Sequence, residues 1–161
     1  MNVRTLAFAA LFAAFAPSAQ SALADTIQPR DGWVVIETSK GFDQLITDVK
    51  SATKAEGMGV VTQAGPTGAA AKRGITIPGN RVIGVFNNDF AVRVLATSTA
   101  AMIEAPIRFY VTENPDGHAT LSYKTPSHVF APYLDEGGAE LVKLADELTQ
   151  KFAAIAQQAS R

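Results

Sequence analysis

Residues 106–124 constrain the fold more than any other part of this chain, because they predict a β-hairpin in one defined register. The centre of the segment holds Pro115-Asp116-Gly117, an order that suits a type I turn followed by a left-handed glycine and a bulge. We expect Asn114 to lie opposite His118, and counting outward from that pair gives the remaining partners. The apolar face then pairs Phe109 with Tyr123 and Val111 with Leu121.

The other face of this hairpin is polar or amphipathic and pairs Tyr110 with Ser122, Thr112 with Thr120 and Arg108 with Lys124. One apolar and one polar face are typical of an antiparallel sheet that is packed on one side only. A slip of one residue would move Phe109 and Leu121 into solvent, so the pattern favours this register. Pro106 then occupies the first position of its strand, which a sheet tolerates.

Short strands and amphipathic helices are predicted along the rest of the chain from apolar spacing and from glycine or proline breaks. The expected strands cover 33–38, 58–63 and 81–86, and the expected helices cover 42–54, one turn at 69–73, a segment opened by Asn88, and 139–158 after Gly137-Gly138. These elements predict an α+β fold of two layers: a small, mostly antiparallel sheet with helices packed on one face, in the order β-α-β-β-α-β-β-α.

Two local details are also predicted. Pro78 followed by Gly79 is the order of a type II turn, whose third residue takes positive φ. Asn88 is expected to cap the helix that it opens, because its side-chain oxygen accepts hydrogen bonds from free amides at a helix start. The buried face of that helix is expected to consist of Phe90, Val94 and Leu95.

The first 24 residues predict a cleavable signal peptide. Arg4 precedes an apolar run of about twelve residues, which is shorter than the roughly 20 residues needed to span a bilayer. Ala22-Leu23-Ala24 fits the small-x-small pattern of signal peptidase, so cleavage is expected after Ala24. We therefore expect one domain over 25–161, located in the periplasm or secreted, with no membrane contact after the signal is removed.

Composition excludes several classes of protein. The chain has no Cys, which excludes disulfides, Cys-ligated zinc, iron–sulfur clusters and a Cys nucleophile, and suits an oxidising periplasm. Its 14 basic and 15 acidic residues argue against nucleic-acid binding, which depends on clustered Lys and Arg.

Four separated segments resemble the domain of unknown function 302 family. They are 82–88, 104–108, 116–117 and 121–126, which correspond to a Phe-Gly-Asn-Pro strand end, an Asp-Leu-Pro-Leu-Lys motif, a Gly turn and a Ser-Tyr-Asn-x-Pro motif. The resemblance covers about 33–133 and implies a small α+β fold, often dimeric, with no established reaction. Asn87-Asn88 departs from the Gly-Asn-Pro ending, and the His that often precedes the family's Ala-rich turn has no counterpart here, so no ligand chemistry is expected from it.

No metal site and no cofactor are predicted. His118 and His128 are the only imidazoles, and the chain lacks HExxH spacing. It also lacks the Gly-x-Ser-x-Gly elbow of many hydrolases and the Gly-Lys-Ser/Thr ending of a phosphate loop.

Two groups of residues are candidates for ligand binding. Glu104 and Arg108 are expected to form a polar cluster near Tyr123 and Lys124, or else a plain exposed ion pair of about 0–1 kcal/mol. The amides after Asn87-Asn88 are expected either to attract a small anion or simply to be capped.

Two functions follow from these candidates. The first is an exported, non-enzymatic binding or accessory protein that holds a small polar molecule and forms a homodimer through an uncovered sheet face or edge. The alternative is a small periplasmic enzyme, hydrolytic in type, that uses Tyr123, His128 and Glu104. The candidate ligand-binding residues are Asn87, Asn88, Glu104, Arg108, Tyr123, Lys124 and His128.

Overall fold

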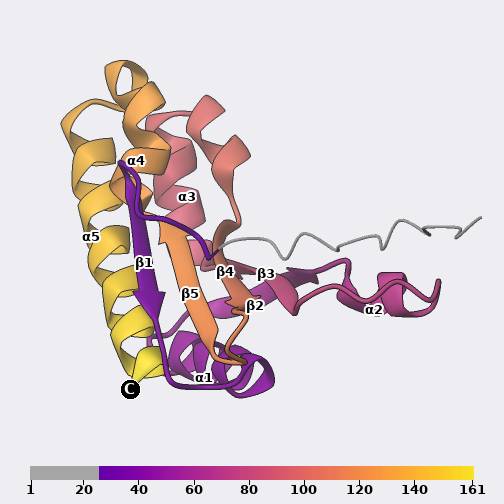
Figure 1. The fold of residues 1–161 in the computed structure, drawn as a ribbon. Coiled ribbons are helices and arrows are strands. Elements are labelled where there is room, and N and C mark those ends of the chain that lie inside the picture. Colours follow the sequence, from indigo (N-terminus) through magenta and orange to yellow (C-terminus); the bar gives the residue numbers. More distant parts are fainter. Residues whose placement is uncertain (1–25) are drawn as a thin grey trace, which may run out of the picture.

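Alternating apolar residues in strands and apolar stripes in helices organise residues 26–161, which the computed structural model describes (Figure 1). The predicted signal peptide lies outside the described residues. The strands are β1 (Trp33–Glu37), β2 (Gly59–Ala64), β3 (Asn80–Phe86), β4 (Ile107–Glu113) and β5 (Ala119–Lys124). The helices are α1 (Phe42–Ala55), α2 (Thr67–Ala71), α3 (Asn88–Thr97), α4 (Pro126–Phe130) and α5 (Leu134–Ser160), with 3-10 turns η1 (Ala100–Glu104) and η2 (Ala131–Tyr133).

The five strands form one antiparallel sheet in the order β1-β5-β4-β3-β2. The register predicted for the β4–β5 hairpin is confirmed, with Phe109 opposite Tyr123 and Val111 opposite Leu121. The amide of Asn114 donates to the carbonyl of His118 over 2.7 Å, and the turn closes through Gly117 at a φ of 84°. The turn therefore sets the register of the hairpin, and the register decides which residues face the core.

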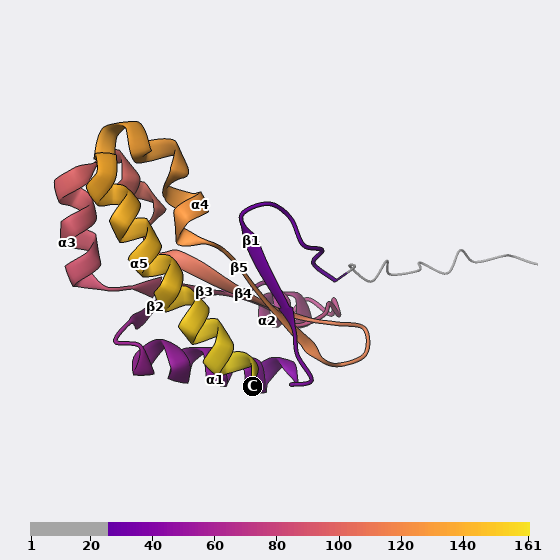
Figure 2. The same ribbon diagram turned by 90° about the vertical axis from the view of Figure 1, so that its left-hand side faces the viewer.

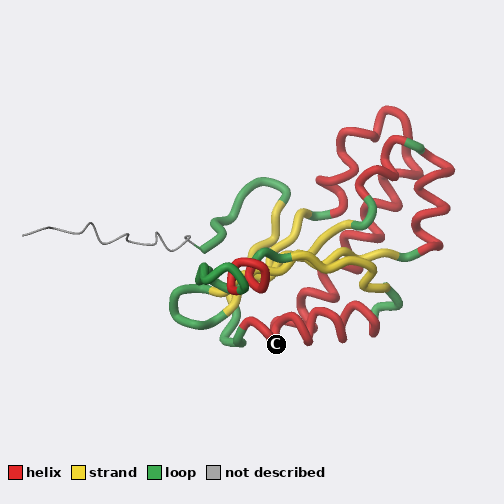
Figure 3. Tube along the Cα trace, turned by 90° about the vertical axis from the view of Figure 1, so that its right-hand side faces the viewer, coloured by secondary structure: helices red, strands yellow, loops and turns green. Residues whose placement is uncertain are grey.

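Four helices, α1, α3, α4 and α5, pack on one face of this sheet, while α2 lies apart in the β2–β3 connection (Figures 1 and 3). The predicted two-layer α+β fold is confirmed. The short helix α2 overlaps the helical turn predicted at 69–73, whereas the short helix α4 was not predicted. The second face of the sheet has no helix on it in residues 26–161, and the homodimer expected through this face or an edge stays a prediction.

The core is centred on three aromatic rings. Phe109 stacks on Phe152 of α5 with ring centroids 4.7 Å apart, and Tyr123 meets Phe109 edge-on at 5.1 Å. Because α5 runs along the sheet (Figure 2), its apolar stripe covers the inward side chains of the hairpin. Every stripe residue predicted for this helix is buried: Leu141, Leu144, Ala145, Leu148, Phe152 and Ile155.

The break predicted at Gly137-Gly138 is confirmed. Gly138 has a non-helical φ of 57° and divides α5 into two helical segments, and the second segment corresponds to the predicted helix over 139–158. The first segment, which begins at Leu134, was not predicted. None of the helices in residues 26–161 combines the length and apolar character needed to cross a membrane.

Two local predictions are wrong. Gly79 has no positive φ, so the type II turn is absent; a Cβ there would lie 2.7 Å from the Phe42 ring, and this close approach is what requires glycine. Leu95 is 47% exposed, because the buried stripe of α3 runs through Ala91 and Val94.

We predict that Phe152→Ala lowers the free energy of unfolding by about 3–5 kcal/mol, because it leaves a cavity between α5 and the hairpin. Chemical denaturation measures this change. Val142→Ala on the same helix is the control, since Val142 is 43% exposed and should cost within about 0.5 kcal/mol. Equal stability of the two variants would contradict the packing described here.

Candidate functional site

The uncovered face of the sheet carries side chains in rows set by the strand register. Trp33 pairs with Lys124, and Gly84 pairs with Arg108. Since Phe109 lies opposite Tyr123, continuing the antiparallel ladder by one residue places Arg108 beside Lys124. One row therefore runs across four strands as Trp33, Lys124, Arg108 and Gly84.

A pocket of about 430 Å³ lies over this row and over the ends of β4 and β5. We call it the strand-end pocket, and its volume is in the range of small-molecule sites. It brings together four of the seven predicted site residues: Glu104, Arg108, Tyr123 and Lys124. The rest of its lining is Trp33, Asn80, Val82, Ile107, Tyr110 and Val129.

The two cations of the pocket have no acidic partner. Arg108 and Lys124 are exposed, and neither forms an ion pair with a carboxylate in residues 26–161. The expected ion pair between Glu104 and Arg108 is therefore absent. Glu104 instead accepts a hydrogen bond of 2.7 Å from the Tyr133 hydroxyl, and this bond raises the pKa of the Tyr133 phenol.

Hydroxyl groups add further hydrogen-bond donors to the pocket. The Nδ2 of Asn80 donates to Oη of Tyr110 over 2.6 Å, which leaves the Tyr110 hydroxyl hydrogen free to point elsewhere. Burial raises the pKa of the Tyr123 phenol, so this group stays protonated at neutral pH. The ring of Tyr123 packs in the core, so Tyr110 is the tyrosine whose hydroxyl is available as a donor to the pocket.

Cations also surround the Trp33 ring at the edge of the pocket. Nζ of Lys124 lies 5.6 Å from the ring centroid, and the guanidinium carbon of Arg30 lies 5.1 Å from it. Contacts of this kind hold a cation near an aromatic face without neutralising its charge. The pocket thus combines an aromatic wall with positive charge.

Asn87 and Asn88 lie away from this pocket, and the predicted cap is off by one residue. The side-chain oxygen of Asn87 accepts from the amides of Asp89 and Phe90 at 2.9 and 3.1 Å, so Asn87 caps α3. Its Nδ2 donates to the carbonyl of Gly57. Asn88 is exposed as the first residue of the helix, because Asn87, whose backbone is extended, already occupies the cap position.

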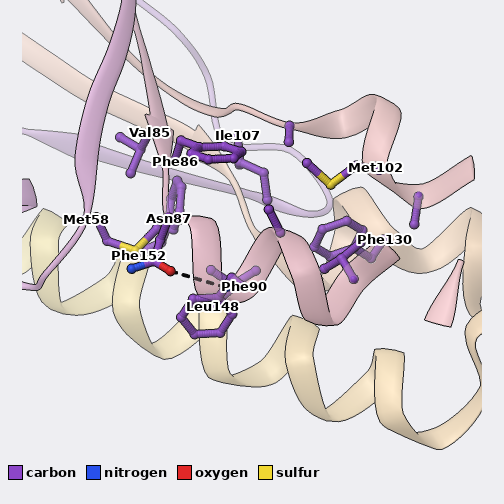
Figure 4. Close-up of a pocket in the computed structure, with 14 residues that line it drawn as sticks. Met58, Val85, Phe86, Asn87, Phe90, Met102, Ile107, Phe130, Leu148 and Phe152 are labelled. Atoms are coloured by element: carbon purple, nitrogen blue, oxygen red, sulfur yellow. Dashed lines mark hydrogen bonds between the residues drawn. The ribbon is translucent and has the colours of Figure 1, made fainter. Parts of the chain in front are cut away.

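Asn87 also borders a second, smaller cavity between the sheet and the helices (Figure 4). This cavity has about 30 Å³, which is room for one or two waters, and its wall is almost wholly apolar. Met58, Phe130 and Phe152 are among the residues that line it. We treat it as a packing space of the core, and the strand-end pocket as the candidate site.

The three residues named for hydrolysis are only partly brought together. Glu104 and Tyr123 line the strand-end pocket, whereas His128 is exposed on α4 and does not line it. The His128 ring lies against Gly32, where a Cβ would come within 2.1 Å of it. The structure finds no group of three or more His, Asp or Glu side chains in residues 26–161 that could hold a metal.

Sequence reasoning missed six lining residues: Trp33, Asn80, Val82, Ile107, Tyr110 and Val129. Strand alternation does indicate that Tyr110 shares a face with Arg108. Trp33 and Asn80 come from strands distant in sequence, and only the order β1-β5-β4-β3 brings them to the same face. No signal in a single sequence gives that order.

Comparisons with known proteins agree on a family. Residues 34–159 match the family described as domain of unknown function DUF302. The chain is also similar to the crystal structure of an uncharacterized conserved protein DUF302 from Bacillus stearothermophilus, with a TM-score of 0.71 and 20% identity over 82% of this chain and 100% of that chain. No curated protein matches the chain. At this identity the structural likeness shows the fold alone.

We predict that Asn87→Ala lowers the free energy of unfolding by about 1–2 kcal/mol, because two helix amides lose their acceptor. Thermal or chemical denaturation measures the change. Asn88→Ala is the matched control and should cost less than about 0.5 kcal/mol, since Asn88 is exposed. If Asn88→Ala lowers the free energy of unfolding more than Asn87→Ala does, Asn88 is the cap, as the sequence predicted.

Proposed function

Because this chain belongs to the DUF302 family, whose description assigns no activity, we propose a function from its own side chains: an exported, non-enzymatic protein that binds a small polar molecule in the strand-end pocket. One observation carries the proposal. Arg108 and Lys124 lie side by side at a concave site and have no carboxylate partner in residues 26–161. Small-molecule sites are typically concave and mostly apolar, with a few polar or charged groups that orient the ligand.

Binding has more support than the hydrolytic alternative. Hydrolysis needs a nucleophile and a base within hydrogen-bond reach of each other. His128, the only imidazole among the residues proposed for catalysis, lies outside the pocket lining, and Glu104 is already bonded to Tyr133. The donors that remain in the pocket, from Arg108, Lys124 and Tyr110, suit recognition of an acceptor-rich molecule.

We predict that at least one compound in a panel of metals, nucleotides, haem and organic acids raises the melting temperature of the purified chain in a saturable way. A ligand that binds only the native state stabilises it by RT ln(1 + [L]/Kd), which is about 2.7 kcal/mol at 100 times Kd. Differential scanning fluorimetry measures the shift. It should be lost in Val82→Trp, which fills the pocket, and in Trp33→Ala, which removes a wall.

Val142→Trp, on exposed α5 surface, is the matched control and should keep the shift. Two results would refute the proposal: no saturable shift with any compound, or a shift that both pocket variants retain. Catalytic turnover of a panel compound that is lost in Tyr123→Phe or His128→Ala would favour the enzyme instead.

We predict for export that the full chain, expressed in a bacterial host, is recovered from the periplasm or the medium with Asp25 as its first residue. Signal peptidase cuts after the second small residue of Ala22-Leu23-Ala24. Intact-mass spectrometry measures the site. Ala24→Tyr should block processing, whereas Gln20→Tyr, outside the small-x-small positions, should not. A cytoplasmic product that retains Met1 would remove the export proposal.

A further inference from the structure

Two like charges stand next to each other on the uncovered face of the sheet. Arg108 of β4 and Lys124 of β5 are cross-strand neighbours by continuation of the Phe109–Tyr123 ladder. Like charges in directly opposite positions of a sheet repel each other and cost stability. Residues 26–161 supply no carboxylate that pairs with either one. An anion placed between them would remove this repulsion.

The net charge of the pocket also favours an anion. Its lining holds two cations, Arg108 and Lys124, and one carboxylate, Glu104. One carboxylate oxygen of Glu104 accepts a hydrogen bond from the Tyr133 hydroxyl, which partly offsets its negative charge. A ligand with a single negative charge therefore leaves the occupied pocket neutral.

The polar groups that face a ligand are mainly donors. The guanidinium of Arg108 and the ammonium of Lys124 have no acceptor capacity. The hydroxyl of Tyr110 is free to donate, because its oxygen already accepts from Asn80. A carboxylate head, with two acceptor oxygens, matches this set better than an amide or an amine does, and hydrogen bonds to charged groups are the strong ones.

The remaining wall of the pocket is largely apolar, so it matches an apolar part of a ligand. Val82, Ile107 and Val129 line it together with the Trp33 ring, and the volume of about 430 Å³ is far larger than an inorganic anion occupies. A bare ion held at Arg108 and Lys124 would leave this wall facing water. A carbon skeleton attached to the head would bury it.

We infer that the ligand of the strand-end pocket is an amphipathic organic monoanion. Its carboxylate lies between Arg108 and Lys124, and its apolar or aromatic body lies against the apolar part of the pocket lining. This inference rests on the proposed binding function and adds the chemical class of the ligand to it. A zwitterion is disfavoured, because its ammonium group would stand close to the same two cations with only a partly engaged Glu104 to pair with.

A series of compounds with one shared body separates these classes by isothermal titration calorimetry. The probes are 3-phenylpropionate, its neutral amide, the cation 3-phenylpropylamine, the zwitterion phenylalanine and the bare head acetate. We expect 3-phenylpropionate to bind about tenfold or more tightly than each of the others, since charge-assisted hydrogen bonds contribute that much. Its affinity should fall as the salt concentration rises.

Charge-removing variants then locate the head. Arg108→Gln and Lys124→Gln should each weaken 3-phenylpropionate by about tenfold, while any residual binding of the amide changes less than about threefold. Both side chains are exposed, so these variants are expected to fold, and melting curves check this. Arg73→Gln and Lys50→Gln remove exposed charges outside the pocket and are the matched controls. Unchanged affinity in both pocket variants would overturn the inference.

The outcomes distinguish the inference from the proposed function. If phenylalanine, the amine or the amide binds more tightly than 3-phenylpropionate and loses affinity in Val82→Trp, the pocket binds ligands but the anion class is wrong. If acetate binds as tightly as 3-phenylpropionate, the apolar body has no role and the inference is likewise wrong. If none of the five probes binds and the compound panel gives no saturable shift, the proposed function itself fails.

Discussion

The pairing of Phe109 with Tyr123 decides the chemistry of both faces of this sheet. On the inner side it presents two rings to Phe152 of α5, and the stack at 4.7 Å closes the core. On the outer side the same pairing sets Arg108 beside Lys124, since alternate residues point to opposite faces. A register one residue away would bury the two cations under the helices and expose the rings, which costs far more than any turn can offset. Core and pocket are therefore two consequences of one alignment, and neither can change register without the other.

The sequence predicts those parts of the structure that depend on neighbouring residues. The hairpin follows from Pro115-Asp116-Gly117 and from alternation, and the stripe of α5 follows from helical spacing, so both predictions are confirmed. The turn at Gly79 and the cap of α3 were predicted from local preferences, and contacts with distant residues bear on both. The Phe42 ring requires the glycine, and Asn87, which caps α3 in place of Asn88, also donates to the carbonyl of Gly57. The candidate site shows the same division. Arg108 and Lys124 were found from the hairpin, but Trp33 and Asn80 reach the pocket through strand order, which depends on contacts between distant segments.

Tyr123 links the stability of the core to the shape of the pocket. Its ring is held against Phe109 and Phe152, and the same residue lines the strand-end pocket. A wall fixed by close-packed rings has few alternative rotamers, so the pocket is preorganised on that side. The basic pair differs, because its side chains are long, exposed and mutually repulsive. These two side chains can adjust around a ligand. A bound anion would reduce the repulsion between them.

Membership of the family constrains the fold of this chain, whereas the choice of ligand depends on its own side chains. The Bacillus stearothermophilus protein has the same fold at 20% identity, so four residues in five differ in the aligned region while the layers remain. Such divergence is what a fold permits when its core needs only apolar residues of suitable volume at inward positions. Arg108 and Lys124 are exposed at outward positions, where Lys124 contacts the Trp33 ring, and neither belongs to the apolar core. Neither cation has a carboxylate partner in residues 26–161, and the proposed binding of an anion rests on that observation.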